Sequence, residues 1–396
     1  MFLRRPATGD IGPGGAPSRL DPPLRAPIAR RYNPQPMRWS PEQLEQFRAA
    51  YEGKRVCLTG GAGFIGGHLA EALVELDAQV VIVDDLSGGA AGADDDAPDV
   101  LSALLEAAPD QVRFLHASIL DTHALDDAME RVRVVFHLAA ISSLPESMRD
   151  PDRAFRVNDR GTFEVCSAAQ VAGARRIIYA ASSSAYGDAG DIAVPESRAP
   201  APLSPYAASK LAGEHVVSAW ARSFGLPGLS MRLFNVYGPR QRVGAGDEGA
   251  VVAAFIERLR RNQPPEIFGD GLQTRDFIHV HDVVTAMLLA GSTHAELRGQ
   301  AVNIGTGRAT TINDLAHQIA EAAERPELRA RLLPARDGDL LHSRADVSLA
   351  RSLLGFEATI PLAEGLRATV EDPLGNALRT GAFPEAAVRT HASARA

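Results

Sequence analysis

Tyr206 and Lys210 are the two side chains of this sequence whose spacing most clearly indicates proton transfer. They form the string Tyr-x-x-x-Lys in a stretch that Ser204-Pro205 opens as a helix. Residues four apart lie on one face of a helix, so the two side chains can act together. A tyrosine pKa is about 10, and lowering it by roughly three units costs about 4 kcal/mol, which neighbouring positive charges can supply. The string alone is common, so its meaning depends on the residues around it.

A run of three serines follows the apolar segment 177–180, which is expected to be a strand. Ser182, Ser183 and Ser184 would then lie at the carboxyl end of a sheet strand, where α/β folds bind ligands. A serine run in this position is often only a solvated turn. Its occurrence together with the tyrosine and lysine favours a catalytic site.

A glycine-rich string, residues 59–66, stands between the first expected strand and the helix after it. Two overlapping patterns, G-x-x-G-x-x-G and G-x-G-x-x-G, fit this string. Glycines allow a positive φ in the turn and let a pyrophosphate approach the N–H groups at the helix start. The strand–turn–helix context therefore predicts a dinucleotide site. We expect the cofactor to contact Gly60, Gly63, Phe64, Ile65 and Gly66.

Asp84 ends the next expected strand, at the spacing of an acid that binds a ribose diol. Asp85 follows it, and no arginine stands there to receive a 2′-phosphate. We therefore expect both aspartates to bind the cofactor and the cofactor to be NAD rather than NADP.

The elements that must position these residues alternate between strands and helices, which predicts an α/β, Rossmann-type, doubly wound parallel sheet. Unbroken apolar strands are expected at 56–59, 80–83, 134–138, 176–180 and 229–233. Helices are expected at 41–51, 64–76, 97–107, 122–131, 151–172 and 206–223. The regularity fades after Gly238, which indicates a smaller C-terminal substrate lobe.

We expect an NAD-binding domain over 37–240, to which the chain returns near 279–305, with a strand at 302–305. The substrate lobe would comprise 241–278 and 306–372. Residues 1–36 mix Pro, Gly and Arg without apolar periodicity and are expected to be a disordered tail, and 373–396 a loose one. An alternative is that Met37 is the true start of the protein.

Composition excludes several classes of protein. A net charge of −8 argues against nucleic-acid binding, which needs a basic surface. No apolar run reaches the roughly 18 residues of a membrane span. The two cysteines, Cys57 and Cys166, stand in apolar runs and are expected to be buried without a disulfide. We expect a cytoplasmic protein with no membrane or nucleic-acid partner, and we predict no metal site.

From Gly60 to about Leu366 the chain resembles the extended short-chain dehydrogenases/reductases, and within them the UDP-hexose 4-epimerases. The matching strings are residues 59–66, 136–140, 182–187, 204–210, 232–241 and 275–282. The closest likeness is to the UDP-N-acetylglucosamine 4-epimerases, through 144–147, 338–346 and the helix before the first strand. The resemblance implies NAD-dependent epimerisation of a UDP-sugar through a 4-keto intermediate.

The resemblance also implies individual roles. Tyr206 would be the catalytic base, Lys210 its electrostatic partner and Ser182 the hydroxyl bonded to the sugar O4. Ala139 and Asn158 would contact the cofactor, as would Tyr206 and Lys210. The substrate-binding residues would be Ser142, Ser143, Ser182, Ser183, Asn235, Arg275, Arg336 and Ser343. Asn235, Arg275 and Arg336 would hold the diphosphate, and Ser343 would line the pocket around the C2 substituent.

Two departures from the family stand at Ser118, where an adenine-binding Asp is frequent, and at Ser142, where hexose epimerases often have Lys. Dehydratases and decarboxylases carry acids where Ser183 and Ser184 stand, so neither of these chemistries has its acid here. Epimerisation needs no acid at these positions.

Three alternatives stay open: a 4-epimerase of UDP-glucose or of a UDP-uronic acid, another sugar-nucleotide-modifying enzyme, and a non-catalytic NAD-binding regulator. The family also implies a homodimer through the helices near 151–172 and 206–223.

Overall fold

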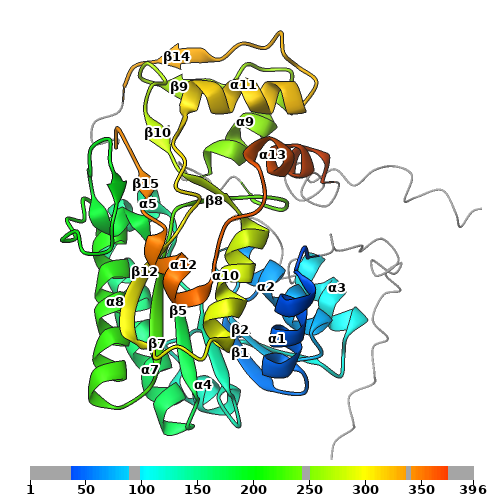
Figure 1. Ribbon diagram of the computed structural model, residues 1–396, viewed down its shortest axis with the longest axis vertical. Coiled ribbons are helices and arrows are strands. Elements are labelled where there is room, and N and C mark those ends of the chain that lie inside the picture. The colour runs from blue at the N-terminus through cyan, green and yellow to red at the C-terminus, as the bar shows by residue number, and fades with distance from the viewer. Residues whose placement is uncertain (1–36, 89–98, 243–249, 336–339, 373–396) are drawn as a thin grey trace, which may run out of the picture.

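A sheet of seven parallel strands forms the centre of the computed structural model, which describes residues 37–88, 99–242, 250–335 and 340–372 (Figure 1). The strand order is β12-β7-β5-β4-β1-β2-β3. The strands are β1 (Arg55–Thr59), β2 (Gln79–Asp84), β3 (Val112–His116), β4 (Val134–His137), β5 (Arg176–Ser182), β7 (Gly228–Leu233) and β12 (Arg298–Ile304). This order places the first strand inside the sheet, as in a doubly wound Rossmann fold, and confirms the predicted fold class.

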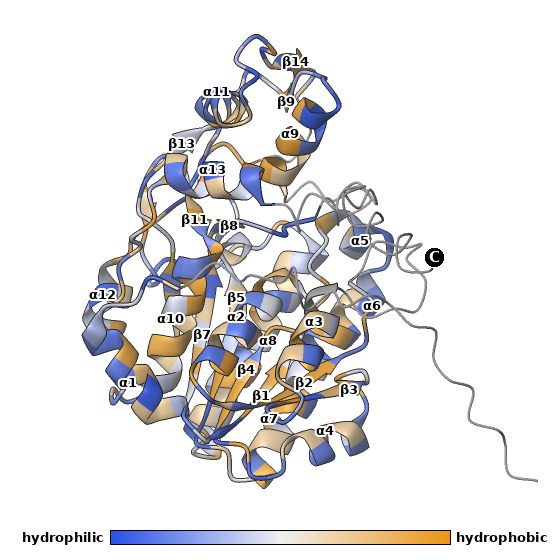
Figure 2. Ribbon diagram, turned by 90° about the vertical axis from the view of Figure 1, so that its right-hand side faces the viewer, coloured by the Kyte–Doolittle hydropathy of each residue, from blue (hydrophilic) through white to orange (hydrophobic). Residues whose placement is uncertain are grey.

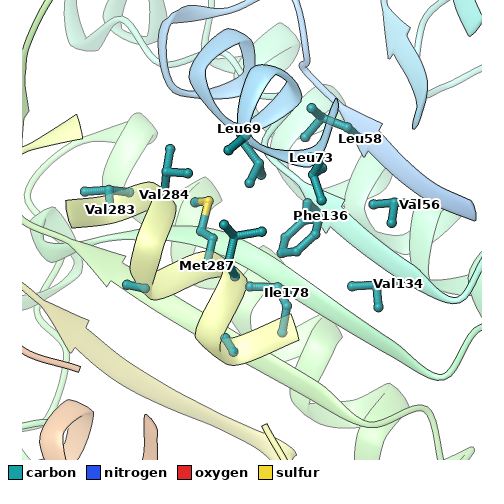
Figure 3. Packing of buried hydrophobic residues seen from close by; sticks show 14 of the residues in the cluster. Val56, Leu58, Leu69, Leu73, Val134, Phe136, Ile178, Val283, Val284 and Met287 are labelled. Carbon is teal, nitrogen blue, oxygen red and sulfur yellow. The ribbon is translucent and has the colours of Figure 1, made fainter. Parts of the chain in front are cut away.

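Helices cover both faces of the sheet because successive strand residues are apolar and point to opposite faces. One face packs against α1 (Pro41–Tyr51), α2 (Phe64–Glu75), α3 (Asp99–Ala107), α10 (Val280–Ser292) and α12 (Ser348–Leu354). Figure 3 shows this core, in which Leu58 and Phe136 meet Leu73 and Met287. The other face packs against α4 (Thr122–Ala128), α7 (Thr162–Val171) and α8 (Pro205–Ser223).

Cys57 and Cys166 lie in this second core, and both are free and buried, as expected. Figure 2 shows the apolar strands enclosed between helices whose outer sides are hydrophilic. Among the helices of the described residues, none has the length and hydrophobicity that a membrane crossing requires.

Helix α1 begins where Ser40 caps it, with Pro41 in its first turn, as the sequence predicts. Its last residue, Tyr51, is buried and donates a hydrogen bond from its hydroxyl to the carbonyl of Leu288 in α10, at 2.7 Å. A Cβ atom at Gly291 would lie 2.1 Å from this hydroxyl, so only glycine lets α1 approach α10 so closely. Helix α1 is thus docked onto an element more than 200 residues away.

A smaller group of elements lies beyond the carboxyl ends of the strands, at the top of Figure 1. Its helices are α9 (Val251–Arg260), α11 (Ile312–Ala322) and α13 (Leu362–Glu371), which share a core of their own with β9 (Glu266–Phe268). The strand β14 (Arg331–Leu333) pairs with β9. Of the strand expected at 302–305, residues 302–304 lie in β12, which ends at Ile304 and pairs with β7. The tails 1–36 and 373–396 are outside the described residues, and the domain boundaries stay a prediction.

Two elements differ from the sequence prediction. Strand β3 was not expected, because Arg113 and His116 are exposed on this edge strand and interrupt its apolar run. The single helix expected over 151–172 is divided into α6 (Pro151–Phe155), a π-helical turn over Arg156–Gly161, and α7. π-helical turns are often found at functional sites, and this one contains Asn158.

Candidate active site

The glycine loop joins β1 to α2, and two of its glycines are required by the protein's own packing. Gly60 has a φ of +73°, and a Cβ atom there would lie 2.5 Å from the backbone nitrogen of Ala139. A Cβ atom at Gly66 would lie 2.1 Å from the carbonyl oxygen of Gly60. The loop therefore fits tightly between the start of α2 and the end of β4. This packing brings the predicted residue Ala139 against the loop.

Gly63 has a different environment. Among the described residues, a Cβ atom there would meet only the carbonyl oxygen of Gly60, at 3.3 Å. Gly63 precedes the first turn of α2, and no side chain of the described residues caps that turn. The N–H groups at Phe64 and Ile65 have no acceptor within the helix. The open side of Gly63 and these donors fit a pyrophosphate, which approaches a helix start along its backbone.

Asp84 fixes the other side of the loop. Its carboxylate accepts hydrogen bonds from the N–H groups of Ala62 and Leu86, both at 2.9 Å. Burial raises the pKa of Asp84, and these two hydrogen bonds oppose that rise. Each oxygen keeps a free lone pair for a ribose hydroxyl. Asp85 instead is exposed, and its carboxylate accepts a hydrogen bond from the backbone N–H of Ser87 at 3.0 Å. The two aspartates therefore have different surroundings.

Tyr206 and Lys210 lie in the first two turns of α8, which Ser204 caps by accepting from the N–H of Ala207 at 3.1 Å. Helix α8 packs against β5 and against the turn that follows this strand. Lys210 is buried, and burial lowers its pKa to about 7. Tyr206 is half-buried.

Ser182 ends β5 and caps the short 3₁₀ turn that Ser183 begins. Its Oγ accepts from the Oγ of Ser184 at 2.8 Å. This hydrogen bond leaves the proton of Ser182 available to a substrate oxygen. Ser182 thus lies at the carboxyl end of β5, the strand against which the helix of Tyr206 and Lys210 packs.

The backbone of Tyr206 is held on both sides. Its N–H donates to the Oγ of Ser147 at 3.1 Å, and its carbonyl accepts from the Oγ of Ser209 at 2.9 Å. Asn158 donates to Ser209 at 2.9 Å and accepts from the N–H of Ile141 at 2.7 Å. Asn158 therefore links the loop after β4 to α8, and contact with the cofactor stays a prediction. Ser147 lies in the string 144–147, but no sequence pattern reveals that it bonds to the tyrosine backbone.

The loop after β4 contains two further serines that were predicted to bind substrate. Ser143 caps α5 (Leu144–Arg149) by accepting from the N–H of Glu146 at 3.2 Å. Ser142 is exposed beside it. Ser143 therefore has a structural role of its own, and substrate contact by either serine stays a prediction.

The predicted diphosphate and sugar residues lie on short strands between the sheet and the small lobe. Asn235 begins β8 (Asn235–Tyr237), which pairs with β11 (Phe277–His279), and Arg275 lies in β10 (Thr274–Arg275). Ser343 precedes β15 (Arg344–Ala345), and its N–H donates to the carbonyl of Thr274 at 3.1 Å. The structure thus brings Ser343 next to the strand of Arg275. Arg336 lies outside the described residues.

Asp276 holds these short strands to the sheet. It is fully buried and accepts from the N–H groups of Thr306 (2.8 Å), Gly307 (2.9 Å) and Ala345 (3.1 Å) and from the hydroxyl of Thr306 (2.6 Å). It therefore joins the end of β12 to β15. Within the described residues, no group of three or more His, Cys, Asp and Glu side chains is placed to hold a metal ion.

Residues 56–305 match the model of the NAD dependent epimerase/dehydratase family. The chain belongs to this family of NAD-dependent enzymes, and NAD is its cofactor. The matched segment runs from the strand before the glycine loop to the end of the sheet, so it includes both Tyr206 and Lys210.

Curated and solved relatives extend the comparison over about four-fifths of the chain. A UDP-glucose 4-epimerase of Mycolicibacterium smegmatis is 38% identical over 319 residues, which cover 80% of this chain and 97% of the relative. The structure is similar to a UDP-N-acetylglucosamine 4-epimerase from Methanobrevibacter ruminantium in complex with UDP-N-acetylmuramic acid, with a TM-score of 0.72, 31% identity and coverage of 81% and 98%. It is also similar to a Thermus thermophilus UDP-glucose 4-epimerase in complex with NAD, with a TM-score of 0.70, 33% identity and coverage of 80% and 98%.

Proposed function

We propose that this protein catalyses the 4-epimerisation of a UDP-sugar, with a UDP-N-acetylhexosamine as its substrate. The observation that carries the proposal is the packing of Tyr206 and Lys210 on α8 against the strand that ends at Ser182. The relatives named above, which are UDP-sugar 4-epimerases, support the reaction type. The choice of an N-acetylated sugar rests on the small residue at position 343.

The residues of this chain have separable tasks in the reaction. Tyr206 takes the proton of the sugar 4-hydroxyl and returns a proton after the 4-keto sugar has rotated in the site. Ser182 donates a hydrogen bond to O4, and the positive charge of Lys210 stabilises the ionised tyrosine. NAD supplies reversible hydride acceptance at C4. Asn235, Arg275 and Arg336 hold the diphosphate while the 4-keto sugar rotates, so the nucleotide contributes binding energy throughout.

The other readings differ in what they require of the site. A dehydratase or decarboxylase needs an acid beside Ser182, whereas Ser183 and Ser184 are hydroxyls. A non-catalytic NAD-binding regulator needs neither the tyrosine nor the lysine. UDP-glucose and UDP-glucuronate remain the alternative substrates, since relatives with these substrates are similar in fold.

One experiment tests the reaction and the substrate together. Incubation with UDP-N-acetylglucosamine, UDP-glucose and UDP-glucuronate, followed by NMR analysis of the products, should show inversion at C4 without a change in mass. UDP-N-acetylglucosamine is expected to be converted at least as efficiently as UDP-glucose. A product that has lost water or carbon dioxide would contradict epimerisation.

The purified protein is expected to retain NAD(H), because the cofactor is reduced and reoxidised within one turnover and need not leave. Asp84, buried at the end of β2, favours the unphosphorylated ribose. Mass spectrometry of the cofactor released by denaturation measures its identity. Mainly NADP, or a need for stoichiometric reductant, would contradict this assignment.

We also expect a homodimer formed through α7 and α8. Aromatic residues join the two helices: Trp220 packs against Phe163 and Phe224 with ring centroids at 4.9 Å and 5.2 Å. Phe224 and Val171 are 57% and 77% exposed, so α7 and the end of α8 present apolar side chains that a partner subunit would cover. Light scattering should give twice the mass of the chain, and Val171→Arg should shift the protein towards monomer. A monomer at micromolar concentration in the unmodified protein would contradict the prediction.

A further inference from the structure

Lys210 is a buried amine that lacks the usual partner for its charge. The residue is only 3% exposed, and among the described residues no carboxylate forms an ion pair with its ammonium group. Glu214, one turn further along α8, is already bound by Arg232 through two hydrogen bonds of 2.9 Å and 2.6 Å. A buried ammonium without compensation is strongly disfavoured, so some other group must stabilise the protonated lysine that Tyr206 needs.

The ring of Tyr179 is that group. The Nζ atom of Lys210 lies 4.2 Å from the ring centroid, and Tyr179 is fully buried in β5. The hydroxyl of Tyr179 donates to the carbonyl of Lys210 at 3.3 Å, so the same side chain contacts both the backbone and the amine. A Cβ atom at Gly213 would lie 2.5 Å from this hydroxyl, so glycine there permits the close approach of α8. A cation on an aromatic face is attracted most strongly where water is excluded.

The other neighbour of the Tyr179 ring carries no charge. His137 in β4 lies with its ring centroid 5.3 Å away and bonds to Thr59 at 2.7 Å and to Thr162 at 2.9 Å. Burial, with a smaller effect of Lys210, lowers the pKa of His137 to about 3, so the imidazole is neutral at pH 7. The titratable groups around the pair are thus His137 of β4, Cys166 of α7, Tyr206 and Glu214 of α8, and Arg232 of β7. Glu214 and Arg232 neutralise each other.

We propose that Tyr179 is a positioning residue for catalysis: the face of its ring holds the Lys210 ammonium in place and in its charged form. This inference rests on the proposed roles of Tyr206 and Lys210. Strand β5 then provides two groups to the site, the hydroxyl of Ser182 at its end and the ring that supports the lysine three residues earlier.

The sign of the effect follows from the charge. A protonated lysine favours the ionised form of Tyr206, so it lowers the pKa of that tyrosine. Because burial has already lowered the Lys210 pKa to about 7, loss of the ring would leave a larger neutral fraction near neutral pH. The pKa of Tyr206 would then rise, and the acid limb of the pH–rate profile would move to higher pH.

The test compares Tyr179→Phe, which keeps the ring, with Tyr179→Leu, which removes it, in the NAD-bound protein. Ionisation of Tyr206 is followed by near-ultraviolet tyrosinate absorbance, from which the titration of the matching Tyr206→Phe protein is subtracted. The leucine variant is expected to raise the midpoint by about one pH unit, and the phenylalanine variant to keep it. Phe136→Leu, which removes a buried ring on the opposite face of the sheet, is the control and should leave the midpoint unchanged.

A fluorinated phenylalanine at position 179 covers the case in which the leucine variant does not fold. Fluorination weakens the negative face of the ring at nearly constant shape, so the midpoint should rise with each added fluorine. Equal midpoints for phenylalanine and its fluorinated forms would overturn the proposal. Because the titration needs no sugar substrate, this outcome is distinct from a failure of the epimerase assignment, which the product analysis would reveal.

Discussion

Tyr206→Phe is expected to lower kcat by roughly 10²–10⁴-fold, the contribution typical of acid–base catalysis. The substitution removes only the hydroxyl that takes the 4-OH proton. It leaves in place the hydrogen bonds that hold the backbone of residue 206, because Ser147 and Ser209 bond to main-chain atoms. NAD content and thermal stability should therefore stay close to those of the unmodified protein, and the loss should fall on kcat more than on KM.

Tyr51→Phe provides the matched control, since it removes a phenol hydroxyl from α1, which packs on the face of the sheet opposite to α8. It should reduce stability slightly and leave kcat intact. The mechanism would be wrong if Tyr206→Phe kept more than about a tenth of the rate on the true substrate, because acid–base catalysis normally contributes far more.

The second large effect is expected from Ser343→Tyr. The backbone of Ser343 is tied to Thr274 next to Arg275, and its half-buried side chain is small. If it borders the space around the sugar C2, a tyrosine fills that space and excludes an N-acetyl group. The value of kcat/KM for UDP-N-acetylglucosamine should fall by roughly 100-fold or more, while UDP-glucose is spared.

Ser348→Tyr is the control for this substitution, since it adds the same side chain at an exposed position five residues further along, at the start of α12. Steady-state kinetics with both sugars measure the two variants. Unchanged kcat/KM on UDP-N-acetylglucosamine in Ser343→Tyr would show that this residue only stabilises the turn before β15.

Much of the fold was predictable because the buried strands are unbroken apolar runs and the glycine loop stands between a strand and a helix. The prediction was wrong where exposure changes the pattern: β3 lies at the edge, and Arg113 interrupts its apolar side chains. The break of the helix at Asn158 was also missed. It accompanies side-chain hydrogen bonds to Ile141 and Ser209, partners that are 17 and 51 residues away in the sequence.

For the candidate site too, some residues could be predicted from the sequence and others could not. Tyr206, Lys210 and Ser182 form recognisable strings, and their position follows from the strand and helix that carry them. Tyr179 and Ser147 join the site only because other elements pack against theirs: Ser147 bonds to the backbone of Tyr206, and the Tyr179 ring contacts Lys210. Sequence patterns do not reveal which side chains of β5 face α8. Asp84 and Asp85 were both expected to bind the cofactor, but of the two only Asp84 bonds to the glycine loop.

The docking of α1 on α10 has a consequence for the order in which the chain folds on the ribosome. At about 5 to 20 residues per second, α10 is synthesised some 10 to 50 s after α1. During this interval Phe47 and Tyr51, both fully buried in the finished structure, have no partner helix to cover them. Contacts so distant in sequence also make folding slow. Nascent chains of this protein should therefore expose these two aromatic side chains of α1, which chaperones can bind, until residues 280–292 have emerged.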